Sequence, residues 1–146
     1  MITASIDLSA INAKLDKITA AAAAATRPAA QAGAQVLYEE VRQRASTAAS
    51  SAEKHSAPGN APFVQSGTLR DAIYQAYADD ESGESRSVYR VSWNKRKAPH
   101  GGLLERGTSR MAARPFLRPG YDAARQRALS TAQQVLAAQV RKELPP

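Results

Sequence analysis

Alanine dominates the apolar part of this sequence and limits how large a core the chain can build. The 146 residues include 31 alanines, whereas leucine, isoleucine, valine and phenylalanine together number only 24. An alanine methyl buries little area, since each buried methylene contributes only about 0.8 kcal/mol. Alanine is also the best helix former. The composition therefore predicts a single domain (residues 1–146) of long helices around a small core, with burial completed by partner subunits.

Two stretches near the start have the spacing of amphipathic helices. The apolar stripe of the first comprises Leu8, Ile11, Leu15, Ile18, Ala22 and Ala25. The stripe of the second comprises Ala30, Ala34, Leu37, Val41, Ala45 and Ala48. A residue that precedes proline avoids the helical region, and proline suits the first turn of a helix. We therefore expect helices over about residues 8–53, divided at Arg27-Pro28.

The middle of the chain has loop and strand signals. Residues 50–67 are rich in proline, glycine and serine and predict a flexible loop. Two short runs then alternate along their length, and the polar segment 79–87 separates them. They predict an antiparallel β-hairpin over about residues 69–94, with Tyr89, Val91 and Trp93 on its core face.

The last third of the chain predicts a short turn followed by a long helix. A helical turn around Leu103 to Glu105 should end at Gly107, before an Arg-Pro-Phe segment within residues 100–119. Pro119 suits the first turn of a C-terminal helix over about residues 119–143. The fold class expected is α+β, in which long N-terminal helices and a C-terminal helix pack on a small antiparallel sheet.

Residue types needed for catalysis or metal binding are sparse. The chain has no cysteine, and His55 and His100 lie in separate loops, whereas a zinc site needs about four ligands. It has neither a glycine-rich phosphate loop nor a G-x-S-x-G motif. Glu105 is a lone acid in a basic segment, so we expect it to pair with an arginine, within the chain or across an interface, rather than to catalyse hydrolysis. We therefore expect no enzyme activity, no cofactor and no metal.

Positive charge is concentrated between Arg86 and Arg127. This segment holds eleven basic residues against two acidic ones, within a chain of net charge +7. One interpretation is a solvated face that keeps the protein soluble. Because non-specific contact with DNA phosphates needs only placed lysines and arginines, the alternative function is a small DNA-binding protein that uses the Arg86–Arg127 surface. No apolar run is long enough to span a membrane, and we expect no signal peptide.

Two stretches carry motifs in a characteristic order and spacing. The first is Gly67-x-Leu69-Arg70, and the second is Glu105-x-Gly107-Thr108, followed by Arg114-Pro115-Phe116-Leu117-Arg118-Pro119. With these motifs the chain resembles the gene-product-ten-like family of tail-completion, head–tail joining or minor tail proteins of long-tailed double-stranded-DNA phages. It departs from the family pattern at His100, where an aromatic residue is usual, and at Arg106, where phenylalanine is common.

The resemblance implies a non-enzymatic protein of the virion neck or tail, assembled in the host bacterial cytoplasm. It implies a ring of six copies that contacts connector or neck proteins and tail-terminator or tail-tube proteins, with non-specific contact to passing double-stranded DNA left open. The motif residues, taken as possible interface residues, are Gly67, Leu69, Arg70, Glu105, Gly107, Thr108, Arg114, Pro115, Phe116, Arg118 and Pro119. Two interpretations of the Arg-Pro-Phe segment stay open: a structural corner that docks the last helix, or a contact with a neighbouring protein.

Overall fold

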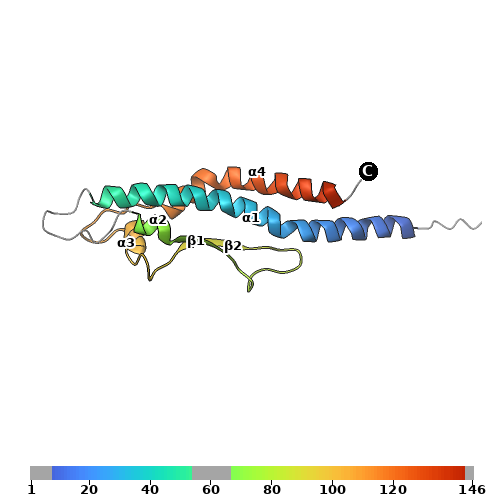
Figure 1. The fold of residues 1–146 in the computed structure, drawn as a ribbon, viewed down its shortest axis with the longest axis horizontal. Helices are drawn as coiled ribbons and strands as arrows, with labels where there is room; N and C mark the ends of the chain where they lie inside the picture. Colours follow the sequence, from blue (N-terminus) through green and yellow to red (C-terminus); the bar gives the residue numbers. More distant parts are fainter. Residues whose placement is uncertain (1–7, 54–66, 144–146) are drawn as a thin grey trace, which may run out of the picture.

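Two long antiparallel helices form the body of the molecule. The computed structural model describes residues 8–53 and 67–143. Helix α1 (Ser9–Glu53) lies between helix α4 (Leu117–Glu143) on one side and a small layer on the other (Figure 1). That layer contains α2 (Thr68–Ala72), β1 (Ile73–Tyr77), β2 (Tyr89–Trp93) and α3 (Gly101–Arg106). The predicted α+β class is confirmed.

Helix α1 is continuous over 45 residues, about 68 Å, so the predicted break at Pro28 is wrong. A proline removes one backbone hydrogen bond and crowds the preceding turn, which bends a helix rather than always ending it. Here both flanks are held, because Ala25 and Ala29 are buried. The Arg27 guanidinium also lies over the Tyr77 ring, 4.5 Å from its centroid. These tertiary contacts override the local preference at Pro28.

Small residues let α1 and α4 approach closely. A Cβ atom added at Gly33 would lie 3.0 Å from the Ala128 carbonyl oxygen, and one at Gly120 would lie 2.9 Å from Val41 Cγ2. The predicted stripe is buried at Ala34, Val41 and Ala45. A further link between the helices is the ion pair of Arg127 with Glu40, at 2.7 Å.

The sheet is the predicted antiparallel hairpin, but it is shorter than expected. Its register pairs Ile73 with Trp93 and Tyr77 with Tyr89. Residues 69–72, which we expected within the hairpin, instead belong to α2, because a helical turn brings Leu69 and Ala72 to the same buried face. At the other end of the chain, α4 begins at Leu117, two residues before the predicted start.

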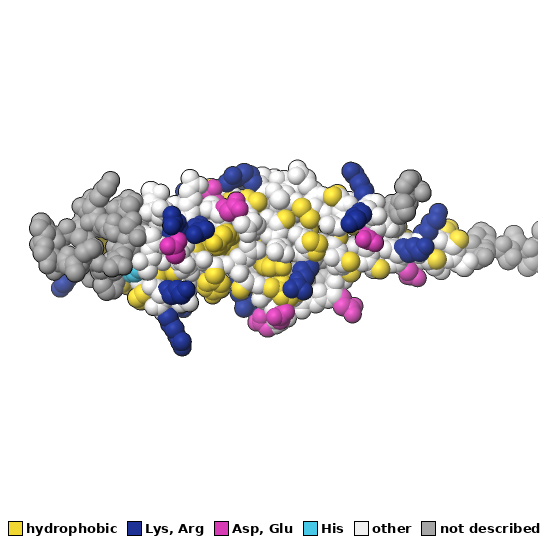
Figure 2. All heavy atoms as spheres, in the orientation of Figure 1, with side chains coloured by type: hydrophobic (Ala, Val, Ile, Leu, Met, Phe, Trp, Pro, Cys, Tyr) yellow, Lys and Arg dark blue, Asp and Glu magenta, His cyan; other side chains and the backbone are white. Residues whose placement is uncertain are grey.

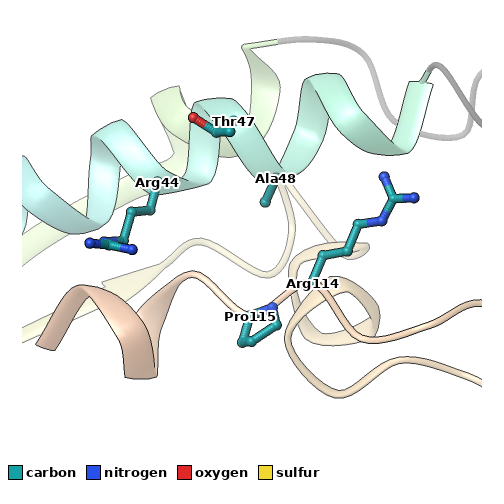
Figure 3. A pocket seen from close by; sticks show the side chains of 5 residues that line it. All are labelled: Arg44, Thr47, Ala48, Arg114 and Pro115. Carbon is teal, nitrogen blue, oxygen red and sulfur yellow. The ribbon is translucent and has the colours of Figure 1, made fainter. Parts of the chain in front are cut away.

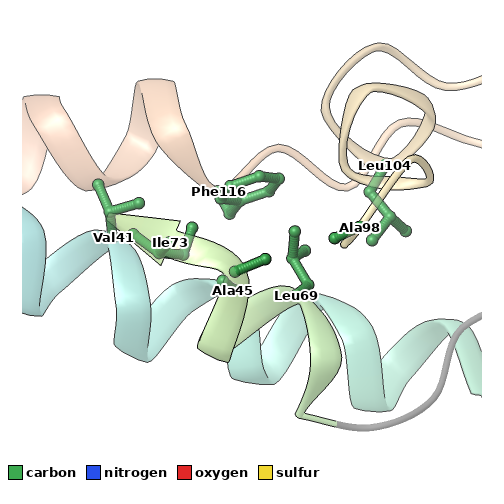
Figure 4. Packing of buried hydrophobic residues seen from close by; sticks show 8 residues of the cluster. Val41, Ala45, Leu69, Ile73, Ala98, Leu104 and Phe116 are labelled. Carbon is green, nitrogen blue, oxygen red and sulfur yellow. The ribbon is translucent and has the colours of Figure 1, made fainter. Parts of the chain in front are cut away.

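The core is small and lies where α1, α2, β1, α3 and the start of α4 meet (Figure 4). Its buried members are Val41, Ala45, Leu69, Ala72, Ile73, Ala98, Leu104 and Phe116. The largest fully buried side chains are Phe116, Leu69 and Leu104. Val91 and Trp93 pack against this cluster, as predicted for the core face of the hairpin, while Tyr89 packs edge-on against Tyr77.

Other apolar stripes are not covered. The first predicted stripe is exposed at four large residues, Leu8, Ile11, Leu15 and Ile18, which are 44–54% exposed. Tyr121, Leu129 and Leu136 on α4 are exposed as well. The predicted loop begins later than expected, since α1 continues to Glu53. Residues 54–66, the remainder of that loop, lie outside the described part of the chain.

Candidate functional site

The first motif forms a tight turn that leads into α2. Gly67 has φ 92°, a left-handed conformation that glycine adopts without steric penalty, and the Asp71 N–H bonds to its carbonyl oxygen at 2.9 Å. Leu69 then enters the core, whereas the exposed Arg70 bonds to Asp71 at 3.1 Å. Arg42 on α1 reaches the same carboxylate oxygen at 3.3 Å. Hydrogen bonds from Arg70 and Arg42 hold the pKa of Asp71 below its ordinary value.

The second motif ends α3 and reverses the chain at Gly107. The Gly107 N–H closes the helix on the Leu103 carbonyl oxygen at 2.7 Å, and φ at Gly107 is 75°. A Cβ atom there would lie 2.7 Å from the Ala113 nitrogen and 2.9 Å from the Met111 oxygen. Both the backbone angle and the lack of space therefore require glycine.

Thr108 organises the four-residue turn that follows. Its backbone exchanges hydrogen bonds with Met111, at 2.8 and 3.3 Å. Its hydroxyl oxygen accepts bonds from the backbone N–H groups of Arg110 and Met111, at 3.3 and 3.0 Å. Side-chain oxygens of this kind are typical turn stabilisers. The turn leaves Ser109 and Arg110 exposed at its tip.

Glu105 caps α4, which corrects the expectation of an ion pair with an arginine within the chain. Its carboxylate accepts backbone N–H groups from Phe116 (2.8 Å), Leu117 (3.1 Å) and Arg118 (3.2 Å). The first N–H groups of a helix have no partner within the helix, and a negative charge there is favoured by the helix dipole. Across residues 67–143, no ion pair to Glu105 is formed.

The remaining donors at the start of α4 are also accounted for. Pro119 has no N–H group, so its position in the first turn leaves no donor unpaired. The Gly120 N–H bonds to the Phe116 carbonyl oxygen at 3.1 Å. The Glu105 carboxylate and Pro119 together therefore satisfy this terminus and fix the direction in which the 27-residue helix leaves the core.

Phe116 anchors the corner from the apolar side. Its ring is fully buried and meets Trp93 edge-on, with centroids 5.9 Å apart. The Trp93 indole in turn lies over Gly101, where a Cβ atom would be only 2.5 Å from Nε1. The sequence predicted Trp93 in the core but not its packing on Gly101, although the Gly101-Gly102 pair beside the motif was the available signal.

The arginines of this region extend outward rather than into the core. Arg106, Arg110 and Arg118 are exposed and Arg114 is half-buried. No ion pair joins any of these four to another described residue. Basic side chains project from the end of the molecule that holds α2 and α3 (Figure 2). The Glu105 carboxylate binds backbone N–H groups and forms no ion pair with these arginines.

A hollow of about 390 Å³ separates the Arg-Pro-Phe segment from α1. Arg44, Thr47 and Ala48 line it from α1, and Arg114 and Pro115 line it from the opposite side (Figure 3). The guanidinium groups of Arg44 and Arg114 extend to opposite sides of it. Arg44 forms an ion pair with Glu40 at 2.9 Å, whereas Arg114 Nη1 is buried without a hydrogen-bond partner.

Two further titratable groups are shifted by their surroundings. Hydrogen bonds from Arg44, together with Arg127, hold the pKa of Glu40 below its ordinary value, although partial burial opposes the shift. Burial lowers the pKa of the His100 imidazole, which is 4% exposed at the start of α3. Residues 8–53 and 67–143 contain no cluster of three or more metal-ligating side chains. They also contain no helix long and apolar enough to cross a membrane.

Comparison with known proteins decides the family. A family model described as "Bacteriophage HK97-gp10, putative tail-component" matches residues 9–107. The chain belongs to the HK97-gp10-like family of phage tail components. No curated protein and no solved structure matches it.

The HK97-gp10-like match runs from the start of α1 to Gly107. It therefore includes the Gly67 turn and the Glu105-x-Gly107 element, while the Arg-Pro-Phe segment and α4 follow it. The structure joins the two motifs in one core, because Leu69 lies with Leu104 and Phe116. Arg70 lies apart from them, beside Arg42. Of the two positions at which the motif pattern of the sequence analysis is not followed, His100 is buried and Arg106 is exposed.

Proposed function

We propose that this protein completes the phage tail or neck and supports head–tail joining, as a non-catalytic ring of six subunits in the virion. The family match over residues 9–107 carries the proposal, because it makes the chain a phage tail component. The finer role follows the resemblance of its motifs to tail-completion proteins. Its neighbours would be connector or neck proteins on one side and tail-terminator or tail-tube proteins on the other.

The motif residues divide into two groups that suit such a role. Buried or bonded residues, such as Glu105, Gly107 and Phe116, fix the corner between α3 and α4. The outward motif residue Arg118, like its non-motif neighbour Arg110, has a charge that no described side chain neutralises. Exposed charges of this kind steer association and select partners more than they add affinity. A rigid corner would present them to a neck partner in a fixed arrangement.

A ring is also consistent with the thin core. The described chain leaves large apolar residues exposed on both α1 and α4, including Leu15 and Leu129. A head-to-tail interface closes into a ring when the rotation between copies closes. Neighbouring copies would then complete the burial that alanine-rich helices cannot provide alone.

Electron microscopy of particles made without this protein tests the role. We expect separate heads and tails, or tails with defective ends, and restoration when the wild-type gene is supplied in trans. Among variants supplied in trans, Arg114→Ala should restore fewer joined particles than Asp80→Ala, whose carboxylate is a solvent-exposed partner of Arg90. Joined, infectious particles in the absence of the protein would contradict the role.

Contact with DNA is a second candidate, favoured by the outward arginines at the α2–α3 end. Seven basic residues lie between Lys95 and Arg118, against Glu105 alone. Titration of duplex DNA over a salt series separates the two functions, because each neutralised phosphate steepens the salt dependence. Submicromolar binding at physiological salt with a steep salt slope would favour a DNA-binding protein. Weak binding that vanishes at that salt would leave only transient contact with passing DNA.

A further inference from the structure

The N-terminal part of α1 is an exposed amphipathic helix, which we call the arm (residues 8–20). Every residue of the arm is exposed, and Leu8, Ile11, Leu15 and Ile18 repeat at spacings of three and four. This is the spacing of a helical seam. In Figure 1 the arm extends past the end of α4, so no other described element covers it.

A groove of about 380 Å³ lies between the hairpin, α1 and α4 of the same chain. Leu37 forms part of its floor, Val88 and Tyr89 form the hairpin wall, and Tyr121 and Leu129 form the α4 wall. The α4 wall runs from Tyr121 to Leu129, a rise of about 12 Å, and the stripe from Leu8 to Ile18 spans about 15 Å. The lengths of the groove and the stripe are therefore similar.

The charges beside the arm and the groove are complementary on both flanks. At 100° per residue, Lys14 and Lys17 lie on one side of the arm's stripe and Asp16 lies on the other. Beside the hairpin wall are two exposed acids, Asp79 and Glu84, and one exposed base, Arg86, none of which forms an ion pair with a described residue, so their net charge is negative. The α4 wall carries Arg125, which is also exposed and forms no such pair.

We propose that the arm of one copy binds in the groove formed by the hairpin, α1 and α4 of a second copy. Its apolar stripe covers Leu129 and Tyr121, its lysines face the acidic hairpin, and Asp16 faces Arg125. Each copy has one arm and one groove, so the contact is head-to-tail and propagates around a ring. The inference deepens the proposed function, since it names the surfaces by which the subunits of the ring meet.

The absence of cysteine makes cross-linking a direct test. A chain with Leu15→Cys is mixed with a chain carrying Leu129→Cys under mild oxidation, and the products are separated by mass. We expect a heterodimer that disappears on reduction. The matched control replaces Leu129→Cys by Leu103→Cys, which is also an exposed leucine but lies on α3. The control should give at least tenfold less heterodimer.

Two outcomes would overturn the inference. Cross-linking of the Leu15→Cys chain to itself, without the heterodimer, would show that two arms pair with each other. Equal cross-linking to Leu129→Cys and Leu103→Cys, or none to either, would show that the groove is not the receptor. Circular dichroism of each variant verifies that the fold is retained.

Mixing of charged variants tests the head-to-tail geometry independently. Leu15→Asp disables the arm and Leu129→Asp disables the groove, so each variant alone should remain monomeric across a concentration series measured by light scattering. Mixed together they should form dimers and nothing larger, because one competent arm and one competent groove remain. Failure of the mixture to dimerise would contradict the geometry.

These results are separable from those that test the role in the phage. Joined particles without the protein would refute the proposed function and leave the solution cross-link intact. A missing cross-link, with unjoined particles when the gene is absent, would refute the arm–groove contact and leave the function standing.

Discussion

The corner between α3 and α4 and the N-terminal arm of α1 differ in where their groups find partners. At the corner, Glu105 binds the backbone N–H groups at the start of α4, and Phe116 is fully buried against Trp93. In the arm, Leu15 and its three apolar neighbours are about half exposed. The polar and apolar groups of the corner find their partners within one chain. The arm, in contrast, has the pattern of a surface that packs against a second chain. In this family member, the corner whose groups are paired within the chain and the uncovered apolar stripe thus lie at opposite ends of the molecule.

The largest difference between the two regions should come from paired truncations. Phe116→Ala removes a fully buried ring and should lower the free energy of unfolding by about 3–5 kcal/mol. Leu15→Ala should change it by no more than about 0.5 kcal/mol in the dilute monomer, because the side chain is already half exposed. Urea unfolding at low protein concentration measures both. Similar losses of unfolding free energy for the two variants would contradict the difference between the corner and the arm.

Gly107→Ala should have the next largest effect. The added methyl meets the Ala113 nitrogen and the Met111 oxygen, in a backbone conformation that costs about 1–3 kcal/mol for residues with a Cβ atom. Gly83→Ala is the matched control, because a Cβ atom there has nothing within 4 Å. Thermal unfolding should show a clear drop for Gly107→Ala and almost none for Gly83→Ala. Equal melting temperatures would contradict the strained turn.

Glu105→Ala should cost about 0.5–2 kcal/mol, which is the range for loss of a helix cap. The three N–H groups it binds would lose their acceptor, and the first turn of α4 would fray. Asp80→Ala, which breaks only a surface pair with Arg90, should cost less than about 1 kcal/mol. Chemical unfolding gives the energies, and amide exchange at Leu117 and Arg118 locates the fraying. Unchanged exchange at those two amides would contradict the capping role.

The smallest expected effect is a dependence of stability on pH through His100. Burial lowers the pKa of this imidazole in the folded chain, so the unfolded chain binds a proton more readily. The contribution of His100 is therefore complete above its ordinary pKa of about 6.5 and is lost as pH falls below that value. His100→Phe, which removes the titratable imidazole, should flatten the decline in stability between about pH 7 and 5. An unchanged dependence of stability on pH would show that a group other than His100 causes the decline.

The sequence predicted the elements governed by local pattern. The spacing of Ala34, Val41 and Ala45 predicted a buried stripe, and alternation predicted the strands that pair Ile73 with Trp93. These signals depend on neighbours along the chain, so they can be recognised without knowledge of the fold.

The predictions that were wrong at Pro28 and Glu105 depend on contacts between residues that are distant in the sequence. Pro28 stays inside α1 because contacts made by distant residues, such as Tyr77, hold both of its flanks. Glu105 caps a helix that starts twelve residues later, which charge counting among nearby arginines did not reveal. The exposure of Leu15 and Leu129 was also invisible to the pattern, because an apolar stripe does not specify whether its partner lies in the same chain.

Hydrogen exchange of the dilute protein and of its assembled form tests the division between corner and arm most directly. We expect the amides of Leu117 and Arg118 to be protected in both states, since Glu105 binds them within one chain. The amides of residues 12–20 should exchange rapidly in the dilute monomer and become protected on assembly, because exposed helical turns open locally. Strong protection of the arm in the dilute monomer, or none gained on assembly, would contradict the claim that a neighbouring copy completes it.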